Sequence, residues 1–209
     1  MKYSIDTLVE LVKINMEESQ DGYGTLPLPE IDSVGIDHYI KEKIPEAVVK
    51  VFAAAPSYLL EQTDMREQLV PKPYQDGSGE VVLPDDMLKM TLFRMHGWKR
   101  PVTDFLHDTH PVAELQNNIY SRGGAAKPVA VITHNGEGNR VLRYYSLPPE
   151  TRIHKIEEAL YVKLPDLSHP VEINEVLLPS VTYLAAAMVY EITGEAARAA
   201  IMNQRVVVG

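Results

Sequence analysis

The sequence predicts an α+β fold: a small helical bundle, formed by both ends of the chain, with an inserted β-rich domain. Apolar residues recur at helical spacing near both ends of the 209-residue chain. Between residues 64 and 164 the pattern changes to short apolar runs separated by turn residues. We therefore expect a helical part (residues 1–63 and 165–209) and a β-rich part (residues 64–164).

The chain begins with an amphipathic helix, expected over residues 5–16. Ser4 is suited to cap its N-terminus. Its apolar face contains Ile5, Leu8, Val9, Val12 and Met16. Residues 19–33 hold two glycines and two prolines, which predict a linker rather than a helix or a central strand.

A second helical region is expected after Ser33. Its apolar face runs through Ile36, Tyr39 and Ile40 and continues at Ala47, Val48, Val51 and Phe52. Pro45 interrupts this face, and we expect it to start a fresh helix, because a first-turn residue needs no N–H. Pro56 should end the region.

The middle of the chain reads as strands and turns. Strands are expected at residues 80–83, 87–98, 129–133, 140–146 and 159–163. The residues between the third and fourth of these include Asn135-Gly136 and Gly138, which indicate a β-hairpin. Residues 121–127 are rich in glycine and alanine and predict a loop.

The clearest helix signal lies near the end of the chain. Pro179 and Ser180 open it, and Thr193-Gly194 closes it. Its apolar stripe consists of Val181, Leu184, Ala185, Met188, Val189 and Ile192. A short alanine-rich helix is expected over residues 195–204, followed by a β-prone tail over residues 205–209.

Composition excludes several classes of site. The chain has no cysteine, so disulfides, thiol nucleophiles and cysteine-ligated metals are absent. No nucleophile-elbow or phosphate-loop motif occurs. The net charge of -9 disfavours tight nucleic-acid binding. The first residues lack the pattern of a signal peptide, and no apolar run is long enough to span a bilayer.

One segment has the residue types of a metal site. His107-Asp108-Thr109-His110, with Asp104 nearby, could ligate zinc or iron if both histidines lay on one helix. Pro111 follows directly and pushes His110 out of helical geometry. A solvated polar loop is therefore the favoured interpretation, and a metal-dependent enzyme stays as an alternative.

Two further groups have a structural and a functional interpretation. Asp85-Asp86 follows Pro84 and is expected to form a turn rather than a carboxylate pair. Trp98, Tyr144 and Tyr145 lie near basic residues and could offer a stacking surface to a ligand, the basis of a second alternative, a bacterial ligand-binding module. Packing inside the sheet is favoured for these aromatic residues.

In its arrangement the sequence resembles the adaptor and ring proteins at the neck and tail of short-tailed double-stranded DNA phages. These include tail tubular and gatekeeper-type proteins and the ring proteins of crAss-like phages. The resemblance rests on four segments: an N-terminal helical part with Ile44-Pro45-Glu46-Ala47-Val48, a strand entry at residues 83–88 (LPDDML), a later strand with Leu142-Arg143-Tyr144-Tyr145, and a small-residue closing helix over residues 179–195.

The resemblance implies a structural virion protein without catalytic, cofactor-binding or metal-binding residues. Its subunits would form a closed ring, such as a dodecamer, stacked on the portal or on a neighbouring ring. DNA would pass through the lumen without specific binding, for which a negative charge is suited. Residues 19–33, 63–78 and 205–209 would be arms that reach neighbouring subunits.

Overall fold

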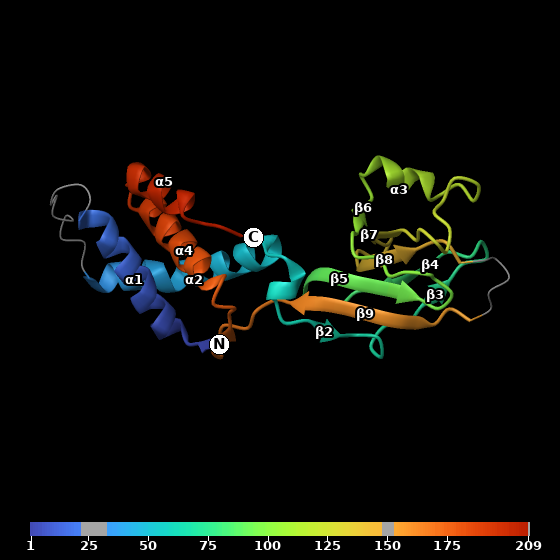
Figure 1. The fold of residues 1–209 in the computed structure, drawn as a ribbon, viewed down its shortest axis with the longest axis horizontal. Coiled ribbons are helices and arrows are strands. Elements are labelled where there is room, and N and C mark those ends of the chain that lie inside the picture. Colours follow the sequence, from blue (N-terminus) through green and yellow to red (C-terminus); the bar gives the residue numbers. More distant parts are fainter. Residues whose placement is uncertain (22–32, 148–152, 209) are drawn as a thin grey trace. The chain divides into compact units, whose positions relative to one another are not determined.

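The computed structural model describes residues 1–21, 33–147 and 153–208, and it confirms an α+β fold (Figure 1). The chain divides into two compact units. The helical unit comprises residues 1–61 and 164–209, and the β-rich unit comprises residues 62–163. The divisions lie within two residues of the positions where the hydrophobic pattern changes.

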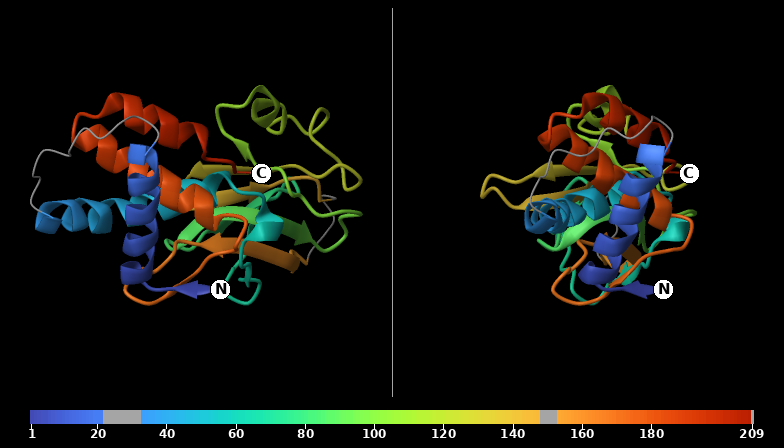
Figure 2. Two further views of the ribbon diagram at one scale, coloured as in Figure 1. Left: turned by 60° about the vertical axis from the view of Figure 1, so that its left-hand side comes forward. Right: turned by 90° about the vertical axis from the view of Figure 1, so that its left-hand side faces the viewer.

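The described residues of the helical unit form the helices α1 (Ile5–Asp21), α2 (Ser33–Ala54), α4 (Leu178–Ile192) and α5 (Ala196–Gln204). Helix α4 packs against the other three, and Figure 2 shows it from two further directions. Ser4 caps α1 as expected, because its Oγ accepts a hydrogen bond of 3.2 Å from the Thr7 amide. The unit thus buries apolar faces from both ends of the chain in one core.

Pro45 does not start a new helix: it lies inside α2, which is continuous. A proline there deprives the Lys41 carbonyl of its helical donor. The side chains of Ile40, Ile44 and Val48 are fully buried on both sides of the proline. Burial of one unbroken apolar face therefore outweighs the missing hydrogen bond.

Helix α1 also differs from its expected length, since it continues to Asp21. The rest of the expected linker, residues 22–32, lies outside the described residues.

Helix α4 is buried on more sides than the predicted stripe. Thr182, Ala187 and Tyr190 lie off that stripe and are buried, whereas Ile192 lies on it and is 47% exposed. The reason is the central place of α4, which has a neighbouring helix on several sides. Its small residues permit this close packing.

The ends of the helical unit hold two elements that the sequence pattern did not indicate. Strand β1 (Lys2–Tyr3) pairs antiparallel with β10 (Val171–Glu172), and a 3-10 turn, η1 (Ser57–Leu59), follows α2. The tail after α5 is β-prone in sequence, and within this chain residues 205–208 form no strand. Instead Val207 is hydrogen-bonded through its amide and its carbonyl to the Ser180 hydroxyl.

The strands described in the β-rich unit form two sheets. One has the order β2 (Thr63–Asp64), β9 (Ile156–Lys163) and β5 (Met87–Met95). The other has the order β3 (Lys72–Pro73), β4 (Gly79–Val82), β8 (Arg140–Tyr144), β7 (Ala130–His134) and β6 (Leu106–His107). The short helix α3 (Pro111–Leu115) follows β6. Pairing is antiparallel except between β6 and β7.

One core joins the inner faces of these sheets. It includes Phe93 from β5, Tyr161 from β9, and Leu142 and Tyr144 from β8, all at most 1% exposed. Leu142 and Tyr144 project from one face of β8 into this core, whereas Arg143 lies on the other face and is only partly buried.

The predicted hairpin is confirmed between β7 and β8. The Asn135 side-chain oxygen accepts hydrogen bonds from the amides of Glu137 and Asn139, and Gly138 takes a φ of +83°. The loop predicted over residues 121–127 is also present. By contrast, the strand predicted over residues 87–98 ends at Met95, because a turn with Gly97 at a φ of +86° follows.

No helix within the described ranges has both the length and the apolar character that crossing a membrane requires.

Candidate functional site

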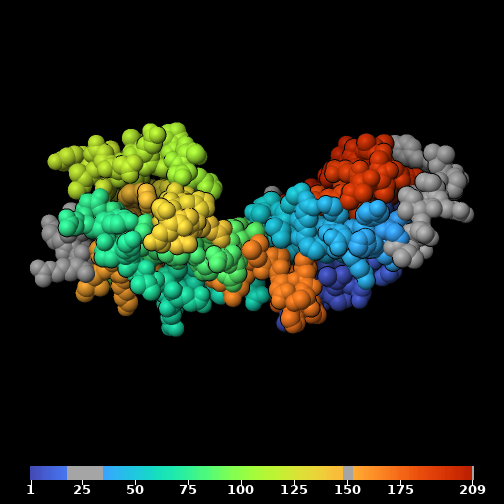
Figure 3. All heavy atoms as spheres, turned by 180° about the vertical axis from the view of Figure 1, so that it is seen from behind, coloured from blue at the N-terminus to red at the C-terminus, as the bar shows by residue number. Residues whose placement is uncertain are grey.

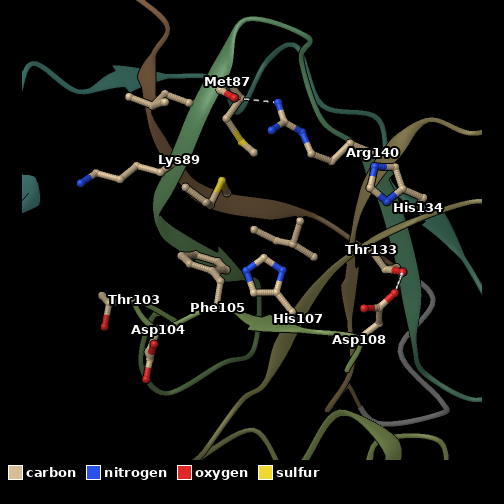
Figure 4. A pocket seen from close by; sticks show the side chains of 13 residues that line it. Met87, Lys89, Thr103, Asp104, Phe105, His107, Asp108, Thr133, His134 and Arg140 are labelled. Atoms are coloured by element: carbon tan, nitrogen blue, oxygen red, sulfur yellow. Dashed lines mark hydrogen bonds between the residues drawn. The ribbon is translucent and has the colours of Figure 1, made fainter. Parts of the chain in front are cut away.

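An open hollow of about 470 Å³ lies in the β-rich unit between β5 and the edge formed by β6 and β7 (Figure 4). Strand β5 and the loop before β6 form one wall, and β6, β7 and the start of β8 form the other. Lining residues that carry polar groups are Lys89, Thr103, Asp104, His107, Asp108, Thr133, His134 and Arg140. The hollow therefore gathers part of the segment that the sequence marks as a metal candidate.

Strand alternation aims His107 at this hollow. In β6, Leu106 packs beside the small cluster of Ala113, Val131 and Tyr145 on one face of the sheet. The next side chain, His107, points to the other face. Figure 4 shows its ring beside Phe105 and facing into the hollow. No hydrogen-bond partner for the His107 ring occurs among the described residues.

The other members of the candidate metal site are held elsewhere. Asp108 accepts a hydrogen bond of 2.9 Å from the Thr133 hydroxyl. Asp104 points away from His107 in Figure 4. His110 has an extended backbone and caps α3, accepting a bond of 3.1 Å from the Val112 amide at Nδ1.

The geometry therefore does not assemble the metal site of the first alternative. In the part of the chain that the structure describes, no group of three histidine or carboxylate side chains could hold a metal ion. The physical reason is Pro111, which occupies the first turn of α3 and leaves His110 outside the helix as its cap.

Sequence reasoning missed Lys89, His134 and Arg140, which the fold brings to the same hollow. The Arg140 guanidinium donates to the carbonyls of Pro84 and Met87, at 3.2 and 2.7 Å, and so ties β8 to the start of β5. Burial lowers the pKa of the Lys89 ammonium below its ordinary value. The only local signal was a lysine within the apolar run of β5.

The chemistry of this hollow is that of a polar contact surface. Arg140 is bonded to the carbonyls of Pro84 and Met87, and Asp108 is bonded to the Thr133 hydroxyl. The His107 ring has no hydrogen-bond partner within the described ranges.

The aromatic surface of the second alternative does not exist. Trp98, Tyr144 and Tyr145 are buried, with at most 7% exposed. The Phe93 ring packs edge-on against Trp98 at 5.8 Å and lies 6.4 Å from the Tyr144 ring. The favoured interpretation of these residues as sheet packing is confirmed, and they have no free face on which a ligand could stack.

The paired aspartates form a turn, as expected. The Met87 amide donates to the Pro84 carbonyl at 3.2 Å across Asp85 and Asp86. Asp86 accepts a hydrogen bond of 3.3 Å from the Tyr161 hydroxyl, so it anchors the turn to β9.

No protein-family model matches the sequence, and no curated protein matches it significantly.

Proposed function

We propose that this chain is a structural subunit of a phage particle, one copy of a closed ring in the neck or tail that joins the portal to other tail components. The observation that carries the proposal is the division of the chain into two units. Its first and last helices form one unit, and the segment between them forms a separate β-rich unit. Two units with separate cores offer distinct surfaces to a neighbour in the ring and to a stacked component.

Exposed apolar side chains on both units support this proposal. Tyr58 and Val176 are 78% and 64% exposed in the helical unit, and Val70 is 79% exposed in the β-rich unit. A further four stand close together in sequence: Val112, Leu115, Ile119 and Tyr120. Single exposed apolar residues are ordinary on a monomer, but a group of this kind is typical of a surface that a partner covers.

The charge of the chain fits the same role. Its formal net charge is -9. A ring of such subunits would present a negative field to DNA, so that the phosphates slide past without binding. The proposal therefore needs no nucleic-acid site on the subunit.

Quantitative peptide mass spectrometry of purified phage particles tests the proposal. Peptides of this chain should occur at an abundance close to that of the portal subunit. Their absence from particles that contain portal and tail proteins would overturn the proposal. A mass measurement of the assembled neck should show copies of the chain in a closed ring.

A further inference from the structure

The hollow of about 470 Å³ that His107 and His134 line, the histidine-lined hollow, opens beside the five-stranded sheet. Strand register sets which side chains share a face there. His107 is the partner of Ile132 across β6 and β7, and His134 is the partner of Arg140 across β7 and β8. Ile132 packs against the core between the sheets, and His134 follows it by two residues on β7. His107, His134 and Arg140 therefore stand on the same, core-facing side of the sheet.

A solute can reach these three groups. His107 and His134 are exposed residues, and Arg140 is half-buried. Figure 4 shows the His107 ring facing into the hollow and the His134 ring next to the Arg140 side chain. In Figure 3 the β7–β8 hairpin (yellow) and β5 (green) lie side by side on the surface of the β-rich unit. The hollow that both of them line is thus open to solvent.

None of the three groups has a carboxylate partner in the described part of the chain. The His107 and His134 rings form no hydrogen bond or ion pair there. Arg140 donates through one terminal nitrogen to the carbonyls of Pro84 and Met87. Its Nε and its other terminal nitrogen have no partner among the described residues, and neither is among the buried atoms that lack one. In a chain with 29 acidic and 20 basic residues, the hollow thus keeps three nitrogen-bearing groups available to an anion.

The other charged groups of the lining make the attraction dependent on pH. Lys89 on β5 adds a positive charge, and Asp104 and Asp108 add negative ones. Asp108 is held by the Thr133 hydroxyl at 2.9 Å, and Asp104 points away from His107 in Figure 4. With both histidines neutral, the lysine and the arginine balance the two carboxylates. Each histidine that gains a proton then adds one net positive charge, so an anion binds more tightly as the pH falls from about 8 to about 6.

The floor of the hollow is apolar. Met87 and Met90 are 3% and 6% exposed, and Phe105 and Ile132 pack against the core. Methionine side chains adapt to the shape of an apolar ligand, and the volume of the hollow is in the range of sites for small organic molecules. An inorganic anion would leave this floor in contact with water, whereas an organic acid covers it with its apolar part.

We infer that the histidine-lined hollow binds a small organic acid, a compound with one carboxylate on an apolar body. The carboxylate lies between the His107 ring and the pair of His134 and Arg140, and it accepts hydrogen bonds from them. The apolar body covers the methionines and Phe105 of the floor. The inference is independent of the ring proposal, because it rests on the residues of this hollow alone.

Proton nuclear magnetic resonance of the full chain tests the inference, with phenylacetate as the probe and phenylacetamide as its uncharged analogue. The ring signals of His107 and His134 should shift as phenylacetate is added, and phenylacetamide should bind about tenfold more weakly. Phenylacetate should bind about fivefold more tightly at pH 6 than at pH 8, because the ligand stays ionised while the histidines gain charge.

His107→Ala and His134→Ala separate binding from folding, because both residues are exposed. Each variant should weaken the binding of phenylacetate about fivefold at pH 6. Each should also reduce the gain in affinity between pH 8 and pH 6, which a purely structural effect would not do. His96→Ala is the matched control: His96 belongs to the same unit, its side chain is 61% exposed, and it does not line the hollow. This variant should keep both the affinity and its pH dependence.

The inference is wrong if phenylacetate leaves the His107 and His134 signals unshifted, or if phenylacetamide binds equally well. Tighter binding of inorganic phosphate than of phenylacetate would also overturn it, because the hollow would then be a site for inorganic anions. Equal affinity at pH 6 and pH 8 would show that the histidines do not hold the carboxylate, with the same consequence.

Discussion

The hydroxyl of Tyr190 in α4 donates a buried hydrogen bond of 2.9 Å to the backbone carbonyl of Met16 in α1. The two residues are 174 positions apart in the sequence. The bond joins the first helix of the chain to the central helix of the same unit. It is a direct physical link between the two segments that enclose the β-rich insertion.

Tyr190→Phe removes this bond and keeps the ring. We expect the helical unit to lose about 1–2 kcal/mol, because the lost hydrogen bond leaves the carbonyl of Met16 with one partner fewer in the core. Urea unfolding followed by far-UV circular dichroism measures the loss. Tyr39→Phe is the matched control: Tyr39 lies on α2, is 39% exposed, and its hydroxyl has no partner among the described residues. Equal stability of the two variants would contradict the prediction.

Gly79→Ala should destabilise the β-rich unit by about 3 kcal/mol or prevent its folding, since overpacking of a fixed core is costly. A Cβ at this position would lie 2.2 Å from the Tyr144 hydroxyl and 2.7 Å from the Lys72 carbonyl. Trp98, the one tryptophan of the chain, is buried in this core and reports its unfolding by fluorescence. Gly136→Ala serves as the control, because its Cβ would meet nothing within 4 Å.

Acid should weaken the β-rich unit through Asp76. Burial raises the pKa of this carboxyl, but hydrogen bonds from Ser78 and Arg122 outweigh that and lower it from 3.8 to about 2. The folded pKa lies below the unfolded one, so the contribution is complete above about pH 4 and is lost as the pH falls towards 2.

Asp76→Asn should therefore lower the urea midpoint of Trp98 fluorescence at pH 7, and the difference from wild type should shrink towards pH 2. Asp166→Asn, in the helical unit, should leave the Trp98 transition unchanged. A difference that is constant from neutral to acid pH would show that the ionised carboxylate of Asp76 is not the stabilising group.

Gly194 closes α4 in a left-handed conformation, with a φ of +82°. The Glu195 amide bonds to the Tyr190 carbonyl, and the Gly194 amide bonds to the Glu191 carbonyl, which is a Schellman end. Gly194→Ala should cost about 1 kcal/mol, because a Cβ disfavours this φ. Gly194→Asn should cost less, since asparagine tolerates it. The order of the two midpoints in circular dichroism checks the cause.

Ser146→Ala should stabilise the β-rich unit, because it removes a buried hydroxyl that lacks a partner among the described residues. Ser146→Gly should add about 1 kcal/mol to that gain, since it also relieves the positive φ. Both gains are measured from the fluorescence of Trp98. If Ser146→Ala is less stable than the wild type, the hydroxyl contributes to the fold and the prediction is wrong.

The sequence by itself determined the local elements. The helix cap at Ser4, the helix end at Gly194 and the Asn135-Gly136 turn each depend on contacts with residues a few positions away. The local sequence is therefore enough to predict them. Long-range effects were not visible there. The continuity of α2 through Pro45 and the burial of α4 depend on helices that come from the other end of the chain.

The contents of the histidine-lined hollow were decided by the tertiary structure alone. His107 was noticed from its neighbours, but its separation from His110 arises from the alternation of β6 and the start of α3. Lys89 comes from β5 and Arg140 from the start of β8. They line one hollow because side-chain juxtaposition depends on strand register and packing rather than on sequence spacing.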